Sequence, residues 1–256
     1  MPYDRWEASK RSEVGSSTDL SAVADPDVAI NLSATKIAGS LKWLVTGLIC
    51  ASILSQVYFR STNHSAGGLV QLFFVDSENN IPSVYSGFAL LFCGILLGII
   101  TVAQSQQRQP FVRHWRILSF IFFYLAVDEL ASIHELAIEP LRGLLKVGGI
   151  LYYTWVVPAA ILLVIFALSY LKFLRALPRK IRRLFIQSGL LYVMGALVTE
   201  LPEGWVEATY TQKSLLFTFL VTFEEALEMG SIVLFLYTLL LYIRTYIRKP
   251  IQLYIN

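Results

Sequence analysis

Long apolar stretches without a charged residue recur along the chain and are separated by short polar segments. About 20 apolar residues suffice for one helical crossing of a bilayer. Transmembrane β-strands would instead alternate apolar and polar positions in segments of about ten residues, and the sequence has no such alternation. We therefore predict an all-α fold, a polytopic bundle of transmembrane helices. The pattern predicts six spans, at residues 41–59, 84–104, 113–138, 149–171, 182–201 and 213–243.

The composition agrees with a membrane domain flanked by polar ends. Of all residues, 55% are hydrophobic and 15% are charged, whereas a soluble domain is about 25% charged. Residues 1–36 predict a polar, mostly disordered tail, residues 37–247 the six-helix transmembrane domain, and residues 248–256 a short end. Cys50 and Cys93 both lie inside apolar stretches. Neither a disulfide framework nor a Cys-rich metal site is expected from them.

Three local features refine the span pattern. Pro158 lies inside the fourth predicted span and predicts a kink there. The apolar segment at residues 69–75 is too short to cross a bilayer, so we expect it to lie at the interface or to dip into the protein. Asn79, Asn80 and Pro82 are typical of a turn that leads into the second span.

The positive charges between the predicted spans are unevenly distributed. Seventeen of the 21 Lys and Arg residues lie on one side of the predicted membrane, with the largest group at residues 172–183. The positive-inside rule makes this side, and with it both termini, cytoplasmic. The lipid bilayer is therefore the main expected partner. Whether the protein also forms a homo-oligomer is left open by the sequence. Because the net charge of +3 comes mostly from these loops, no nucleic-acid partner is expected.

The acidic residues, in contrast, are concentrated in or near the spans. Six of the 18 Asp and Glu residues lie in the N-terminal tail, and the other twelve lie in predicted outer loops or in spans three, five and six. Span three carries "DELASIHE" at residues 128–135, directly after eleven uncharged residues. Span six carries "FEEALEMG" at residues 223–230. Because an acidic group at a helix centre costs about 2.5–3.5 kcal/mol on insertion scales, this pattern indicates a functional site.

Helical spacing places these acids together. A rise of about 1.5 Å per residue puts the acids of spans three, five and six at overlapping depths, between the midplane and the outer surface. In span three, Asp128, Ser132 and Glu135 are expected on one helical face, with Glu129 and His134 flanking it. In span six the three carboxylates fall within about 100° of arc.

The sequence therefore predicts one enclosed polar site. Proton sharing, a bound cation or a water-filled cavity would offset the energetic cost of placing these acids together. Tyr192 and Thr199, like Ser132, are expected to contribute hydroxyl groups. The candidate ligands of a cation or metal ion are Asp128, Glu129, His134, Glu135, Glu200, Glu224, Glu225 and Glu228.

Some acids also have an ordinary structural interpretation. Glu135 and His134 are about equally well interpreted as solvated residues at the outer interface. Lys and Arg occur only at the ends of the acid-bearing spans, several turns from the acids, so buried salt bridges do not account for the rest. The acids interpreted first as solvated loop or turn charges are Asp76, Glu78, Glu139, Glu203 and Glu207.

Spans three and six resemble each other. "FYLAVDELA" at residues 123–131 aligns with "FLVTFEEAL" at residues 219–227. Three spans per half would make the two halves inverted, as in many transporters. A 3+3 inverted repeat is therefore one hypothesis for the architecture.

At these motifs the chain resembles a group of uncharacterised bacterial six-span membrane proteins. The resemblance rests on an Asp-Glu-x4-His-Glu motif at residues 128–135, a Glu-Glu-x2-Glu-Met motif at residues 224–229, and the segment "VDSENNIPSVYSG" at residues 75–87. It implies a location in the bacterial plasma (inner) membrane and does not imply a particular activity.

Three functions fit the predicted site. The first is a cation-handling membrane protein, in transport or ion coupling, that binds a proton, a small cation or another small-molecule substrate. The second is an intramembrane carboxylate-bridged metalloenzyme with a divalent metal ion such as Fe, Mn or Zn, although the Glu129-x4-His134 spacing differs from the usual Glu-x-x-His pair. The third is a subunit in which the polar cluster serves packing. We favour the first.

Overall fold

The structure, a computed structural model, describes residues 33–77 and 79–247. Throughout these residues the regular structure is helical, which confirms the predicted all-α class. The predicted tail lies outside the described residues up to position 32, as does the predicted end at 248–256.

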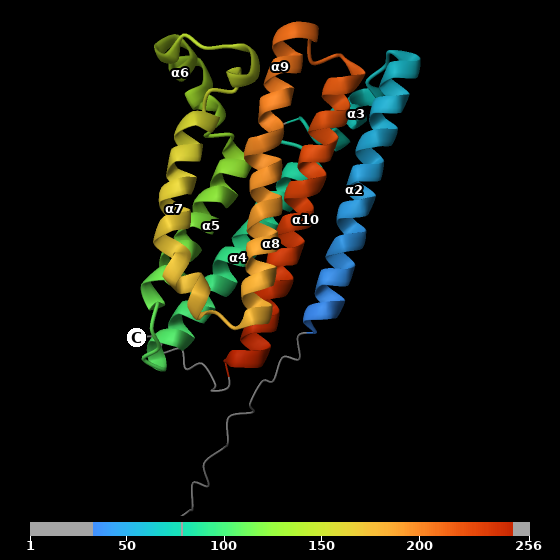
Figure 1. Cartoon of the computed structure of the whole chain (residues 1–256). Helices are drawn as coiled ribbons and strands as arrows, with labels where there is room; N and C mark the ends of the chain where they lie inside the picture. Colours follow the sequence, from blue (N-terminus) through green and yellow to red (C-terminus); the bar gives the residue numbers. More distant parts are fainter. Residues whose placement is uncertain (1–32, 78, 248–256) are drawn as a thin grey trace, which may run out of the picture. The chain divides into compact units, whose positions relative to one another are not determined.

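The bundle consists of long helices joined by short helical turns (Figure 1). The long helices are α2 (Ala34–Thr62), α4 (Ile81–Gln106), α5 (Val112–Ala131), α7 (Val156–Ala176), α8 (Arg179–Val193) and α10 (Leu215–Tyr246). The shorter ones are η1 (Ala66–Gly68), α3 (Leu69–Phe73), η2 (Glu135–Ala137), α6 (Ile138–Leu145), η3 (Gly149–Leu151), η4 (Met194–Thr199) and α9 (Glu200–Tyr210).

Five stretches of helix are long and apolar enough to cross a membrane, and a sixth is added if α5 and the segment Glu135–Leu145 form one bent span. The fifth stretch joins α8, the π-helical turn η4 and α9 into one span, Arg179–Tyr210. This chain is therefore a helical membrane protein.

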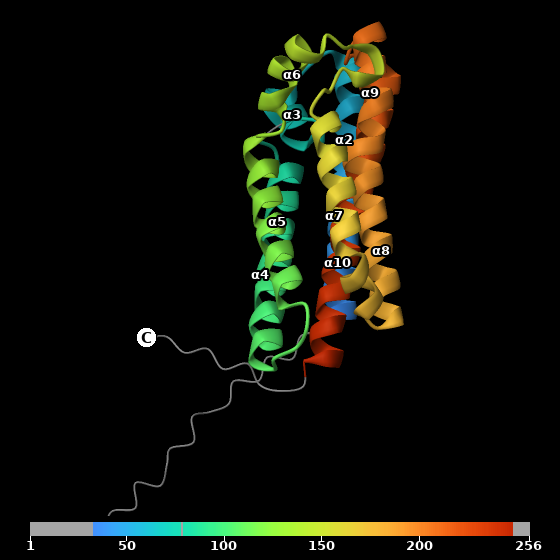
Figure 2. The same cartoon turned by 60° about the vertical axis from the view of Figure 1, so that its left-hand side comes forward.

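Helix α10 packs against α2, α4 and α8, and α4 pairs closely with α5. Figure 2 shows the α4–α5 pair on one side of the bundle, with α7, α8 and α10 on the other. We call the end at which α9 ends and α10 begins the acidic end, which is the upper end in Figure 1. The opposite end, at which α7 passes into α8, is the basic end.

An aromatic core fills the bundle toward the basic end. The rings of Trp115 and Phe173 lie 4.9 Å apart, as do those of Phe185 and Phe235. Tyr242 lies 5.0 Å from Trp115. These side chains come from α5, α7, α8 and α10, so they join helices that are distant in sequence and close this end of the bundle.

The third predicted span is not one continuous helix, because α5 ends at Ala131 and the chain bends by 75° before the segment Glu135–Leu145. Ser132 adopts a left-handed conformation with φ 49°. The Asp128 carboxylate accepts hydrogen bonds from His134 beyond this break, so a polar side chain stabilises a turn in place of further helix. The expected helical face of Asp128, Ser132 and Glu135 is consequently wrong.

The fifth span, predicted at residues 182–201, continues to Tyr210. Pro202 does not end it, because a proline is tolerated in the first turn of a helix and α9 begins at Glu200. Glu203 and Glu207 therefore lie on a helix, and their interpretation as loop charges is wrong.

The fourth span begins later than predicted. Residues 149–155 form a short 3₁₀ turn and a loop, and α7 starts only at Val156. Pro158 thus lies in the first turn of α7, where its missing N–H breaks no helical hydrogen bond. The predicted kink is therefore wrong.

The two similar segments occupy different positions in their helices. "FYLAVDELA" forms the last residues of α5, whereas "FLVTFEEAL" lies in the first half of α10. The 3+3 inverted repeat stays a prediction.

The predicted turn before the second long span is present. Asn80 is the N-cap of α4, accepts a hydrogen bond from the Ser83 N–H at 2.7 Å and donates to the carbonyl of Phe74 at 2.5 Å. Its side chain is 2% exposed. Asn80 therefore fixes both the start of α4 and the preceding α3 segment.

We expect Asn80→Ala to lower the stability by about 1–2 kcal/mol, since this is the range for loss of an N-cap side chain. Thermal unfolding in detergent measures the change. Gln71→Ala, at an exposed amide on α3, is the matched control and should leave the unfolding temperature unchanged. Equal unfolding temperatures for both variants would contradict the assigned role of Asn80.

Candidate functional site

Carboxyl groups from three helices converge toward the acidic end of the bundle. Glu228 on α10 interacts electrostatically with Glu129 on α5 and with Glu200 on α9. Glu225 likewise interacts with Glu129 and Glu203. We call this group the carboxylate cluster; its members are Asp128, Glu129, Glu200, Glu203, Glu224, Glu225 and Glu228.

Helix α9 presents a ladder of carboxylates to this cluster. Glu200, Glu203 and Glu207 are spaced at i, i+3 and i+7, which places them on one face of the helix. At 1.5 Å per residue they extend over about 10 Å along its axis. We call these three residues the α9 ladder. The spacing can be read from the sequence, but it places the three carboxylates on one face only because residues 200–210 are helical.

Glu203 is the most enclosed member of the ladder. Its side chain is 3% exposed and lies beside Glu224, so that the two carboxyl groups interact. Within the described part of the chain, the Glu203 Oε1 atom has no hydrogen-bond partner. Since buried polar atoms are normally paired, this oxygen is a position at which the site lacks a donor.

His134 is placed at the cluster by the break after α5. Its backbone N–H donates to Asp128 Oδ1 at 2.9 Å, and its Nδ1 atom lies 3.0 Å from Oδ2. The imidazole ring packs on Trp155, with the ring centres 4.7 Å apart. The Trp155 Nε1–H in turn donates to Glu200 Oε1 at 3.1 Å. Asp128 and Glu200 are therefore joined through His134 and Trp155.

The segment between α6 and α7, residues 146–155, packs against α9 beside the cluster, and we call it the roof loop. The Tyr153 hydroxyl donates a hydrogen bond to Glu207. Burial of Tyr153, followed by this hydrogen bond, raises the pKa of the Tyr153 hydroxyl. The hydroxyl therefore stays protonated and acts as a donor to the outermost carboxylate of the ladder.

Two contacts hold the roof loop in place. The Arg142 guanidinium donates to the carbonyl of Tyr152 at 2.8 and 3.2 Å and lies 3.9 Å from the centre of its ring. A Cβ atom at Gly204 would lie 3.0 Å from the Cβ atom of Tyr152. The absence of a side chain at Gly204 thus lets α9 approach the loop closely.

The deep side of the cluster is formed by η4 and Tyr192. Tyr192 interacts electrostatically with Glu228, Glu129 and Asp128. A Cβ atom at Gly195 would lie only 2.7 Å from the Glu228 Cγ atom and 3.1 Å from the Glu224 carbonyl oxygen. The glycine therefore makes room for α10 at the position where Glu228 enters the cluster.

Three other predicted site residues lie in turns next to the cluster. Thr199 donates its hydroxyl to the carbonyl of Gly195 within the π-helical turn. Ser132 forms the left-handed end of α5. Glu135 is exposed at the start of η2 and interacts electrostatically with His134 and Glu200.

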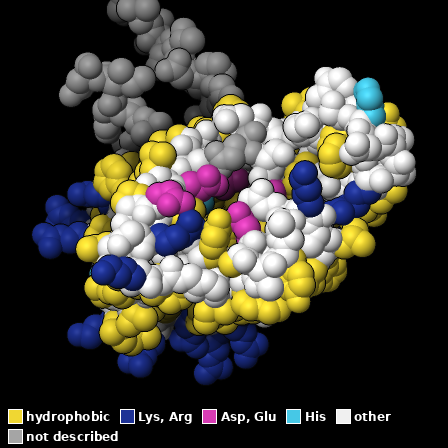
Figure 3. All heavy atoms as spheres, turned by 90° about the horizontal axis from the view of Figure 1, so that it is seen from above, with side chains coloured by type: hydrophobic (Ala, Val, Ile, Leu, Met, Phe, Trp, Pro, Cys, Tyr) yellow, Lys and Arg dark blue, Asp and Glu magenta, His cyan; other side chains and the backbone are white. Residues whose placement is uncertain are grey.

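Acidic side chains are also present on the surface of the acidic end. Figure 3 looks onto this end and shows Asp and Glu side chains gathered near the middle of the face. Asp76, which precedes α4, interacts electrostatically with Glu203 and Glu225. The interpretation of Asp76 as a turn charge is therefore incomplete, because this residue also acts electrostatically on two glutamates of the cluster.

Positive side chains do not balance the enclosed glutamates. Asp128 forms an ion pair with His134, and Glu139 forms one with Arg142. The five glutamates of the cluster on α9 and α10 form no salt bridge with a Lys or Arg among residues 33–77 and 79–247. Like charges at short range repel, so protons, a cation or water must offset the cost of bringing these groups together.

A ligand set focused on one metal ion is not found in the described residues, where no group of three or more His, Cys, Asp or Glu side chains is arranged to hold one. The carboxylates instead lie along the ladder and beside one another in pairs. Bound Fe, Mn or Zn stays a prediction.

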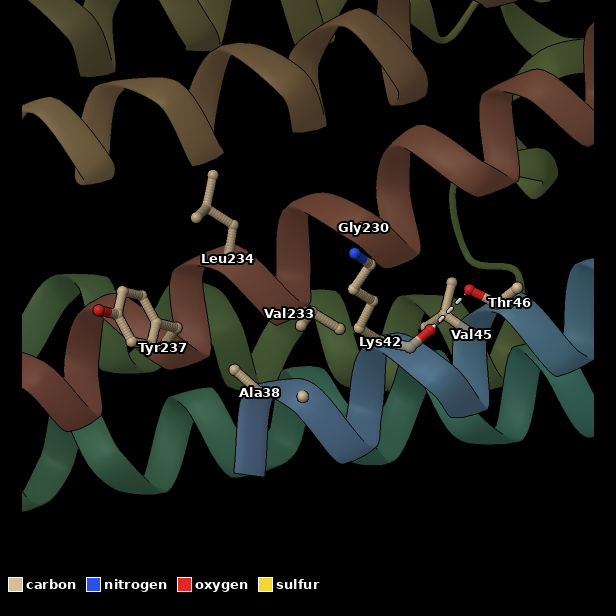
Figure 4. Close-up of a pocket in the computed structure, with 9 residues that line it drawn as sticks. Ala38, Lys42, Val45, Thr46, Gly230, Val233, Leu234 and Tyr237 are labelled. Atoms are coloured by element: carbon tan, nitrogen blue, oxygen red, sulfur yellow. Dashed lines mark hydrogen bonds between the residues drawn. The ribbon is translucent and has the colours of Figure 1, made fainter. Parts of the chain in front are cut away.

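A hollow lies between α2 and α10, away from the carboxylates (Figure 4). Its volume is about 440 Å³, and Lys42 reaches across it toward Gly230. The other residues that line it are Ala38, Gly39, Val45, Thr46, Val233, Leu234 and Tyr237. No carboxylate lines this groove, so it does not extend the cluster.

We expect Gly195→Ala to be less stable than Gly189→Ala by about 1–3 kcal/mol, the usual range for overpacking. Both glycines are helical, but a Cβ atom at Gly189 meets nothing within 4 Å. Thermal unfolding in detergent compares the two variants. Equal stability would show that the close approach of η4 to Glu228 is not required.

Comparison with known proteins yields one family. A family model described as "Domain of unknown function (DUF8692)" matches residues 41–243. No curated protein and no solved structure matches the chain. Because the family model extends from α2 to α10 and includes all the helices that form the carboxylate cluster, the chain belongs to the DUF8692 family.

Proposed function

We propose that this membrane protein binds a cation in the carboxylate cluster and acts in transport or ion coupling across the membrane. The observation that carries the proposal is the close approach of five enclosed glutamates without a basic partner in the described part of the chain. Glu200, Glu203, Glu224, Glu225 and Glu228 approach one another on two neighbouring helices, and within the described ranges no Lys or Arg forms a salt bridge with them.

The energetic argument favours an exchangeable positive charge. Each isolated acid at a helix centre costs about 2.5–3.5 kcal/mol, and mutual repulsion adds to that cost. Shared protons or a bound cation remove both terms. Ionisable groups in membrane helices typically mark ion and proton pathways for this reason.

The two ends of the bundle differ in a way that fits transport. Acidic side chains gather on the face at the acidic end (Figure 3), whereas the aromatic core around Trp115 and Phe173 fills the basic end. A cation would enter from the acidic end in this state. The π-helical turn η4, next to Glu228, is the candidate point for a change of state, since such turns are frequent at functional sites.

The orientation in the membrane belongs to the same proposal. The basic end carries the Lys and Arg residues of the α7–α8 connection and faces the cytoplasm by the positive-inside rule. The acidic end then faces the outside of a bacterial plasma (inner) membrane. Both termini would be cytoplasmic, with α5 and the bent segment after it counted as one of six spans.

We expect purified protein in liposomes to catalyse a pH-dependent cation flux, and Glu203→Gln to reduce it by about tenfold or more. The amide keeps the shape of the side chain but removes one buried ionisable carboxyl group, and loss of a single partner of a bound charge changes binding by this order. Glu139→Gln, at an exposed carboxylate paired with Arg142, is the control and should retain the flux.

Metal analysis of the same preparation distinguishes the transport proposal from the alternative of an intramembrane metalloenzyme. Absence of flux together with stoichiometric Fe, Mn or Zn would replace the transport proposal by the intramembrane metalloenzyme. Absence of both flux and cation binding would refute the proposal as a whole.

The orientation has its own test. In intact cells, a membrane-impermeant maleimide should label Gln212→Cys, which is exposed at the acidic end, and should not label Lys180→Cys at the basic end. After lysis both should react. The reverse pattern in intact cells would overturn the assigned orientation.

A further inference from the structure

The carboxylates of the site form an extended path. The α9 ladder covers about 10 Å from Glu207 to Glu200. Glu200 and Glu203 interact with Glu224 and Glu228, and Glu228 interacts with Glu129. Carboxyl groups therefore follow one another from the Tyr153–Glu207 contact at the roof loop to Tyr192 on the deep side.

We infer that the cation of this site is a linear organic polyamine, a short alkyl chain that carries several ammonium groups. This inference rests on the proposed function and specifies its substrate class. Successive carboxylates on the α9 ladder are about one helical turn, or about 5 Å, apart. Ammonium groups separated by short alkyl spacers repeat over a comparable length, so each ammonium can meet its own carboxylate.

The side chains beside the ladder provide the second part of amine recognition. Trp155 lies next to Glu200 through its Nε1–H hydrogen bond, and Tyr153 lies next to Glu207. Aromatic faces attract ammonium groups and also contact alkyl chains. A carboxylate with an adjacent aromatic ring thus occurs at both ends of the ladder.

Glu203 provides an observation independent of the ladder spacing. Glu203 is 3% exposed, and its carboxyl group shares a hydrogen bond with that of Glu224. Its Oε1 atom, however, is without a hydrogen-bond partner in the described residues. An ammonium group has three N–H donors and no acceptor. It can therefore donate to Glu203 and to a neighbouring carboxylate at once and satisfy the buried oxygen.

The distribution of the acids distinguishes this ligand from a small inorganic ion. A divalent metal ion needs several oxygens at one point, at about 2.0–2.6 Å. The described residues hold no group of three or more ligands arranged in that way. A charge distributed along a flexible chain matches a path of carboxylates better than a charge concentrated at a point.

Isothermal titration of the full-length protein in detergent tests the inference. The probes are the linear triamine spermidine, the monoamine propylamine and manganese chloride, all in the same buffer. We expect one spermidine per chain, bound on the order of tenfold or more tighter than propylamine or Mn²⁺, because several ammonium–carboxylate pairs act together.

Variants connect the binding to the ladder. Glu203→Gln and Glu207→Gln should each weaken spermidine binding by about tenfold, whereas Glu139→Gln, an acid at the same end but outside the ladder, should not. Glu207 is less enclosed than Glu203, so Glu207→Gln keeps the test decisive if Glu203→Gln does not fold. Equal weakening by Glu139→Gln would indicate general attraction to an acidic face and overturn the inference.

The outcomes separate this inference from the proposed function. Cation flux without spermidine binding, or with tighter Mn²⁺ binding, would overturn the polyamine and leave the cation site intact. Absence of binding by every probe together with absence of flux would overturn both.

Discussion

Enclosed carboxylates in an apolar bundle are the constraint on which the rest of this structure depends. A charged acid facing lipid is costly, so each acid-bearing helix must turn its acids toward protein, water or a cation. Helices α5, α9 and α10 all turn their acids inward at the acidic end. Helix α10 packs against both α8 and α4. The aromatic core at the basic end supplies the apolar packing that holds these helices together.

Local departures from regular helix give the site its shape. The left-handed Ser132 ends α5 and returns His134 to Asp128. The π-helical turn η4 places Gly195 against Glu228, where a side chain would not fit. Such irregularities are tolerated where surrounding contacts fix them, and they are frequent at functional sites. Here both lie directly beside the carboxylate cluster.

The roof loop connects the site to the surface. It contributes Tyr153 and Trp155 to two carboxylates of the α9 ladder, and Arg142 holds its backbone. The proposed ligand would meet these aromatic side chains at the ladder, and aromatic rings next to carboxylates favour a cation with apolar character.

The sequence by itself determined the membrane class, the long apolar helices, the Asn80 turn and the acids of spans three and six, because hydrophobic length and the cost of buried charge can be read from residue order alone. Only the tertiary structure decided where α5 ends and that α9 continues past Pro202. Those outcomes depend on contacts between distant segments: the Asp128–His134 hydrogen bonds, and the close packing of Gly204 on Tyr152. The α9 ladder cannot be recognised from the sequence for the same reason. The i, i+3, i+7 spacing of Glu200, Glu203 and Glu207 places them on one face only if neighbouring elements stabilise this segment as a helix.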